Sequence, residues 1–201
     1  QRLCDFLQTK KSIRYFVPPH TDSAGREHDG VNLTIDTDGG TWINCAGENN
    51  FPDGEVFVGP QGAEGHVNYT YPAIHDGRAV EGVRLEFKDG RVVDATATRD
   101  EAFLHAMLDQ DDGARNIAEA AIGTNRDLTR FTGHTLLDEK IGGTFHVAVG
   151  AGYPDAGNHS VSALHWDMVC DLRPDKTTGR PGGVIEADGE VFWKEGLFVG
   201  S

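Results

Sequence analysis

Basic residues are scarce in this chain of 201 residues. Lysine and arginine number 18 against 32 aspartates and glutamates, which gives a formal net charge of −14 and a pI near 4.9. Proteins that bind nucleic acid need a basic surface to displace the counterions of the phosphates. The charge therefore argues against a nucleic-acid partner, and it suits a site that collects divalent cations.

Long apolar runs are also missing. No segment approaches the roughly 20 apolar residues that a membrane helix needs. The N-terminal stretch QRLCDFLQTKK lacks the apolar core of a signal peptide. We therefore expect no membrane partner. The first residue is Gln1 rather than methionine, so we expect either a piece of a longer chain or a naturally short protein.

Cysteine is rare, and its pattern excludes two structural roles. The three cysteines, Cys4, Cys45 and Cys170, form no CxxC pair, so neither a disulfide framework nor a structural zinc knuckle is expected. Cys170 ends an apolar strand pattern, which favours a buried free thiol. Unpaired thiols fit the reducing cytoplasm best.

The signatures of nucleotide binding and of serine hydrolases are absent. The sequence has no GxGxxG after a strand, no GxxxxGK[ST] and no GxSxG. These motifs wrap backbone amides around phosphates or expose a nucleophilic serine. Any catalytic chemistry must therefore come from other side chains.

What is present is typical of one globular domain with β-rich patterning. Hydrophobic residues make up 38% of the chain and charged residues 25%. Alternating segments predict a hairpin over residues 31–45 and another over 80–97, where Asp89-Gly90 supplies the turn. Residues 1–30 are expected to form a short helix and a loop that lead into a domain of residues 31–201.

Helix formers concentrate in one region. Residues 99–122 predict a helix pair, whose second helix carries Ile117, Ala120 and Ala121. Strand signals return afterwards in TFHVAVG, SALHWDMVC and GGVIEADGEVFW. We therefore predict an α+β fold with a mostly antiparallel sheet, barrel-like or sandwiched, and an inserted helix pair around residues 99–122.

The stretch ALHWDMVC contains the first candidate site residues. On a strand, His165 and Asp167 share one face, while Leu164, Trp166 and Met168 share the other. An imidazole and a carboxylate on one face suit a pair of metal ligands or an acid–base pair. A structural His–Asp hydrogen bond fits the same pattern.

Further candidates come from two acidic or glycine-rich segments. In DEKIGGTFHVAVGAGYP, Glu139 precedes a Gly-Gly pair, His146 lies inside a strand pattern, and Tyr153 follows a glycine-rich turn. Glu55 opens a predicted strand, and its simplest interpretation is a surface charge. Glu119 lies among Ala and Ile in the predicted second helix, which favours a buried, partnered carboxylate. The nearest cations in sequence, Arg130 and Lys140, are expected at the surface.

Four segments carry a resemblance to a known family. NNFPDGEVFVGP, GRAVEGVRLEFKDGRVV, DEKIGGTFHVAVGAGYP and HWDMVCDL resemble, in the same order, the metalloaminopeptidases of peptidase family M29, the aminopeptidase T, AmpS and PepS group. The similarity runs from about residue 31 to the C-terminus and covers the family's catalytic part. Family members carry an additional N-terminal α/β domain, whereas only residues 1–30 precede the similarity here.

The resemblance implies a site with two divalent metals. Mixed oxygen and nitrogen ligands suit Zn, Co or Mn. The resemblance also implies a catalytic Tyr153, a peptide substrate with a free N-terminus, and a homo-oligomer, with a dimer expected. The implied metal ligands are Glu55, Glu119, Glu139, His146, His165 and Asp167.

The predicted function is a metal-dependent aminopeptidase. A hydroxide that bridges the metals would attack the scissile carbonyl. Tyr153 would hydrogen-bond the oxyanion, and Glu119, or else Glu139, would pass a proton to the leaving amine. The alternative is a non-catalytic metal-binding or assembly module, or half of a larger enzyme.

Overall fold

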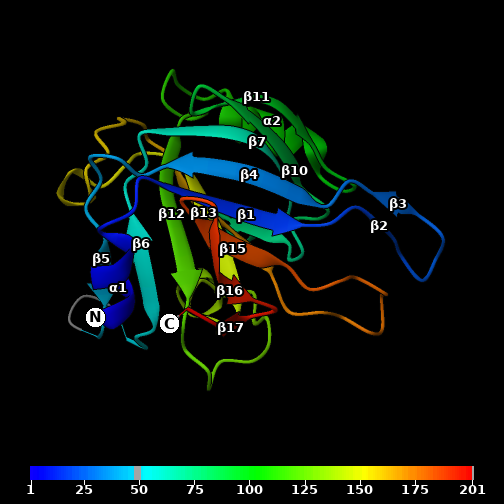
Figure 1. Cartoon of the computed structure of the whole chain (residues 1–201). Helices are drawn as coiled ribbons and strands as arrows, with labels where there is room; N and C mark the ends of the chain where they lie inside the picture. The colour runs from blue at the N-terminus through cyan, green and yellow to red at the C-terminus, as the bar shows by residue number, and fades with distance from the viewer. Residues whose placement is uncertain (48–50, 201) are drawn as a thin grey trace.

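The computed structural model describes residues 1–47 and 51–200, which form two packed antiparallel sheets (Figure 1). Every pairing between named strands is antiparallel, and the described strands close neither sheet into a barrel. The predicted α+β class with a mostly antiparallel sheet is therefore confirmed, as two packed layers. No helix in the described ranges has the length and apolarity to cross a bilayer.

The larger sheet has eight strands and includes the N-terminal segment. Its fifth strand, β1, pairs with β4 on one side and β15 on the other, so part of residues 1–30 lies inside this sheet. In pairing order the strands are β11 (Arg91–Thr96), β10 (Arg84–Lys88), β7 (Gly62–Asn68), β4 (Val31–Asp36), β1 (Ser12–Val17), β15 (Val184–Ala187), β16 (Glu190–Lys194) and β17 (Leu197–Phe198).

The smaller sheet has five strands and crosses behind the larger one. Figure 1 shows β12 running across β1 and β4. In pairing order the strands are β14 (His165–Asp171), β13 (Thr144–Gly150), β12 (Ile117–Gly123), β6 (Glu55–Val58) and β5 (Ile43–Cys45).

Short elements surround the two sheets. Two-stranded ribbons are formed by β2 (His20–Thr21) with β3 (Glu27–His28) and by β8 (Ala73–His75) with β9 (Arg78–Val80). The helices are α1 (Arg2–Leu7), α2 (Glu101–Leu108), α3 (Thr135–Asp138) and a 3₁₀ turn, η1 (Pro154–Ala156).

The predicted helix pair is wrong in its second half. Helix α2 forms within residues 99–122, but Ile117–Gly123 is the central strand β12, and all seven of its residues are buried. A strand covered on both faces loses the polar–apolar alternation that identifies strands in sequence. The alanines of this segment have a high helix propensity, so the sequence alone predicts a helix.

One predicted hairpin is confirmed and the other is wrong. Strands β10 and β11 pair across Asp89 and Gly90, which both adopt the positive φ of a tight hairpin turn. The expected hairpin over residues 31–45 does not form, because β4 pairs with β1 and β7, whereas β5 pairs with β6.

The core lies between the two sheets and fixes the position of β13. The Phe145 ring stacks on the Tyr15 ring at 4.0 Å, and both side chains are fully buried. The Tyr15 hydroxyl donates to the Ala121 carbonyl at 3.2 Å, which ties β1 to β12. Because side chains alternate along a strand, Phe145 in the core places His146 on the opposite face.

Phe145→Ala is expected to lower the free energy of unfolding by about 3–5 kcal/mol, because it removes a buried ring and the stacking contact of that ring with Tyr15. Urea unfolding of the metal-free protein measures the effect. Val93→Ala, at a half-exposed position of β11, is the matched control and should change stability little. An equal loss in both variants would contradict this account of the core.

Candidate metal centre

Four neighbouring strands place five of the six predicted site residues on one face of the smaller sheet. Glu55 opens β6, Glu119 lies in β12, His146 in β13, and His165 and Asp167 in β14. The register pairs Glu119 with Ala148 and Ala148 with Asp167, so these three residues form one row across the sheet.

Small residues make room beside these side chains. Ala121 pairs with His146, Gly123 pairs with Glu55, and Gly150 pairs with His165. Because residues opposite each other on paired strands share a face, these small residues leave space for the acids and imidazoles. The segment IAEAAIG is strand β12, which contributes Glu119 and two small residues to this cluster. Glu119 therefore lies on a strand rather than on the predicted helix.

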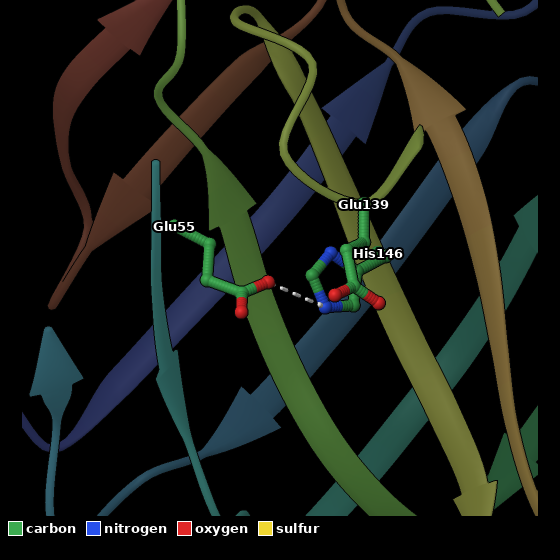
Figure 2. Close-up of side chains that lie close together, drawn as sticks. All are labelled: Glu55, Glu139 and His146. Atoms are coloured by element: carbon green, nitrogen blue, oxygen red, sulfur yellow. Dashed lines mark ion pairs between the residues drawn. The ribbon is translucent and has the colours of Figure 1, made fainter. Parts of the chain in front are cut away.

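Glu139 reaches the same place from a different element. It follows α3, and Figure 2 shows its carboxylate beside the His146 ring, with Glu55 on the other side. The distance from His146 Nε2 to Glu55 Oε2 is 3.6 Å. All six predicted residues are thus brought together, although Glu55 is buried and not the surface charge that its local sequence suggests.

His146 is the centre of the cluster. Its side chain is fully buried, and its Nε2 lies 3.0 Å from Glu119 Oε1 and 4.0 Å from Asp167 Oδ1. Ligand atoms of Glu55, Glu139 and His146 lie within 4.8 Å of one another, and so do those of Glu119, His146 and Asp167. His146 is therefore shared by two groups of three.

His165 extends the second of these groups. Its Nδ1 donates to the Ala151 carbonyl at 2.7 Å, which directs Nε2 toward the acids. Nε2 lies 3.5 Å from Asp167 Oδ2 and 3.9 Å from Glu119 Oε2. A backbone acceptor on one ring nitrogen is the arrangement that orients a metal-binding histidine.

The cluster also contains a cation that sequence reasoning missed. Lys140 was expected at the surface, but its side chain is fully buried, and its Nζ lies 3.2 Å from Glu55 Oε1 and also contacts Glu139 Oε1. Arg130 is exposed, as predicted. The lysine follows a helix of only four residues, too short for an amphipathic pattern to indicate its direction.

The electrostatics of the cluster follow from burial and from these contacts. Burial raises the pKa of Glu119 to about 7. Burial opposes the charge on both imidazoles, yet the hydrogen bond to Glu119 raises the pKa of His146 to about 10. In the same way the bond to Asp167 raises the pKa of His165 to about 9. The imidazoles therefore carry protons at neutral pH in the metal-free protein.

The site opens into a cavity of 420 Å³. Tyr153 lines it and is about half exposed; its ring meets the His165 ring at 5.0 Å and the Phe57 ring at 5.7 Å. The other lining residues are Ile43, Cys45, Glu55, Glu119, Thr135, Leu136, Glu139, Pro154, Asp155, His165 and Asp167. Acids thus share this cavity with several apolar side chains.

A larger cavity of 550 Å³ contains none of the predicted site residues. Its charged side chains are largely paired with one another, as in Arg26 with Asp22 and Arg173 with Asp171. The smaller cavity therefore carries the candidate chemistry.

A family model described as thermophilic metalloprotease (M29) matches residues 10–197. The chain belongs to this family. The M29 resemblance predicted from the four sequence segments is thereby confirmed. The family is one of metalloproteases, so the match supports the use of divalent metal.

Curated M29-type relatives are named aminopeptidases. Aminopeptidase 2 of Geobacillus stearothermophilus is 32% identical over 170 residues, covering 76% of this chain and 38% of the relative. Aminopeptidase T of Thermus thermophilus is 34% identical over 112 residues, covering 53% of this chain and 27% of the relative. The chain thus spans well under two thirds of the length of these relatives.

Two solved structures share the fold. Wild-type AmpT from Thermus thermophilus superposes with a TM-score of 0.78 at 21% identity, over 98% of this chain and 52% of that one. The 2,5-dihydroxypyridine dioxygenase from Pseudomonas putida KT2440 superposes with a TM-score of 0.74 at 14% identity, over 99% of this chain and 58% of that one. Because these two structures belong to differently named proteins, the fold alone does not decide the function of an M29 chain.

The residues of this M29 chain fit divalent cations. Glu55 Oε2 is buried and has no hydrogen-bond partner among the described residues, although it faces the cluster. An unpaired buried carboxylate oxygen is costly, and a bound cation satisfies it. Carboxylates and imidazoles together are a donor set for borderline cations such as Zn²⁺, Co²⁺ and Mn²⁺.

Metal affinity of the M29 chain is expected to rise with pH. A cation binds an imidazole nitrogen only after its proton has left, and the pKa values of His146 and His165 are about 10 and about 9. Below these values binding must release protons, so affinity should increase about tenfold per pH unit for each proton released. Calorimetric Co²⁺ titrations between about pH 6.5 and pH 8.5 measure this slope.

His165→Ala provides the control for this slope. The variant has one fewer imidazole to deprotonate, so it should release about one proton less per protein when the metals bind. A metal affinity that does not change with pH would contradict the assignment of protonated imidazoles to the site.

Proposed function

We propose that this chain is the metal-binding catalytic part of a metal-dependent aminopeptidase. The observation that carries the proposal is the convergence of all six predicted residues, from four strands and the end of α3, around the shared His146. The ligands we propose are Glu55, Glu119, Glu139, His146, His165 and Asp167.

The charge of the cluster supports two cations rather than one. Four carboxylates gather here, and Lys140 supplies one compensating positive charge. The remaining excess of three negative charges is more than a single dication neutralises. Two dications match both the charge and the two groups of three candidate ligands, and His146 Nε2 would bind one of them.

Divalent cations in this site would supply Lewis acidity, which acidifies water and polarises a peptide carbonyl. Tyr153 would donate its hydroxyl proton in a hydrogen bond to the developing oxyanion, because it lines the cavity beside His165. Glu119 lines the same cavity and would carry a proton to the leaving amine.

The cavity also supports a peptide with a free N-terminus as substrate. Asp155 adds a carboxylate to the wall formed by the ligand acids, so the cavity favours a positively charged α-amino group.

We also propose a cellular location and an oligomeric state. The three buried free thiols support a cytoplasmic location, and the family resemblance supports a dimer, which light scattering tests.

Hydrolysis of leucyl-p-nitroanilide tests the proposed function. The chain is stripped of metal with a chelator and then reloaded with Co²⁺ or Zn²⁺. We expect release of nitroaniline only from the reloaded protein, and none from the N-acetylated substrate, which lacks the free amine. Tight metal binding without hydrolysis would instead support the alternative, a metal-binding module or one half of a larger enzyme.

A further inference from the structure

The two groups of three ligands differ in the presence of Lys140. The lysine-side group consists of Glu55, Glu139 and His146, and the Lys140 ammonium contacts both of its carboxylates. The lysine-free group consists of Glu119, His146 and Asp167. Within the described ranges Lys140 forms no ion pair with the second group.

The backbone holds Lys140 in this position. Its amide donates to the Leu137 carbonyl at 3.2 Å, and its own carbonyl accepts from the Asn125 amide at 3.0 Å. The next residue, Ile141, is fully buried and bridges to Asn125. The backbone of the lysine is therefore held between α3 and the end of β12, and its fully buried side chain reaches Glu55 and Glu139 from there.

The Lys140 ammonium binds carboxylate oxygens that a metal cation would use as ligands in the lysine-side group. Glu55 Oε1 already accepts from Lys140, which leaves only Oε2 facing His146. A positive charge beside these carboxylates also repels an incoming dication. The lysine-free group has no such competitor, and it gains His165, whose Nε2 faces both of its carboxylates.

We propose that Lys140 is a positioning residue that makes the two halves of the cluster unequal. The lysine-free group binds the first divalent cation tightly, and the lysine-side group binds the second weakly and exchangeably. This inference rests on the proposed metal-binding function and adds to it an order of filling and a residue that sets that order.

Titration of the metal-free chain with Co²⁺ tests the proposal. Visible absorption of the cobalt ion reports its ligand environment, and calorimetry gives the two affinities. In the wild-type chain we expect two binding phases that differ by at least about tenfold in affinity. Lys140→Met keeps most of the side-chain volume and removes the charge, and the second phase should then tighten by at least about tenfold.

The direction of this change separates the proposal from a merely structural role. A lysine that only supported the fold would, when replaced, weaken both phases or leave both unchanged. Lys176→Met, at an exposed lysine of the other cavity, is the matched control and should leave both phases at their wild-type affinities. A second phase that does not tighten in Lys140→Met overturns the proposal.

A second variant tests the order of filling with Lys140 intact. His165→Ala should weaken the first phase and spare the second, because His165 faces only the lysine-free group. Weakening of the second phase alone would overturn the assignment, even if Lys140→Met fails to fold. Failure of the proposed function gives different results. Without a metal site, a folded wild-type chain would bind no Co²⁺ at all, and without catalysis it would bind Co²⁺ in the two phases but hydrolyse no leucyl-p-nitroanilide.

Discussion

His146→Ala is expected to remove both metals and to reduce hydrolysis of leucyl-p-nitroanilide to below about a thousandth of the wild-type rate. The reason is that His146 belongs to both groups of three ligands, and its Nε2 lies within 4.0 Å of Glu55, Glu119 and Asp167. No other residue of the cluster is shared in this way between the two groups. Elemental analysis of the purified variant gives the metal content.

The metal-free form of this variant should also be less stable near neutral pH. The protonated imidazole of His146 neutralises buried carboxylates, since the hydrogen bond to Glu119 raises its pKa to about 10. Its folded pKa lies above the unfolded value, so this stabilisation is present at low pH and is lost as the pH rises through about 10. Removal of one partner from a buried ion pair typically costs about 3–5 kcal/mol.

His159→Ala is the matched control for His146→Ala. His159 is an exposed histidine outside the cluster, so its loss should change neither the metal content nor the rate. Circular dichroism of both variants shows whether the fold persists. Two bound metals and full activity in a folded His146→Ala protein would remove His146 from the site.

Local patterns predicted the features that depend on neighbouring residues alone. The Asp89-Gly90 turn was found because its dipeptide favours positive φ at both positions, wherever the hairpin lies in the fold. His165 and Asp167 were placed on one strand face because the alternation of side chains is a local property. The same alternation predicted that Trp166 and Met168 would be buried on the other face, as they are.

Tertiary context decided the features that local patterns missed. Ile117–Gly123 is covered on both faces, so no alternation marks it as a strand, and its alanines favour a helix when considered alone. Strand β4 has two partners, β1 and β7, and neither is β5. The hairpin prediction was wrong because turn residues between two strands do not specify which strands pair.

The position of Lys140 shows a further limit of sequence reasoning. A lysine is almost always exposed, and only the two carboxylates that accept its ammonium make its burial possible. Those carboxylates come from β6 and from the end of α3, and they lie 84 positions apart in the chain, from residue 55 to residue 139. The acids themselves were predicted through the resemblance to family M29, which implies ligands but does not describe the cation beside them.

Tyr153→Phe is expected to lower kcat by about a hundredfold to a thousandfold while metal content and KM stay close to wild type. Only the hydroxyl is lost, because the phenylalanine ring retains the contacts with Phe57 and His165 that hold Tyr153 at the cavity. Burial, followed by the nearby carboxylates, raises the pKa of this phenol above its usual range. The hydroxyl therefore keeps its proton at neutral pH and can donate a hydrogen bond to an oxyanion that forms only during the reaction.

Tyr71→Phe is the matched control, since Tyr71 lines the other cavity and its hydroxyl donates to Asp171 at 2.8 Å. It should retain the wild-type kcat on leucyl-p-nitroanilide. The split between kcat and KM distinguishes the possible roles of Tyr153. A loss confined to kcat indicates a hydrogen bond made in the transition state, whereas a rise in KM with unchanged kcat would indicate substrate binding alone. An unchanged kcat in Tyr153→Phe would exclude its hydroxyl from the chemical step, and the oxyanion would then depend on the bound cations alone.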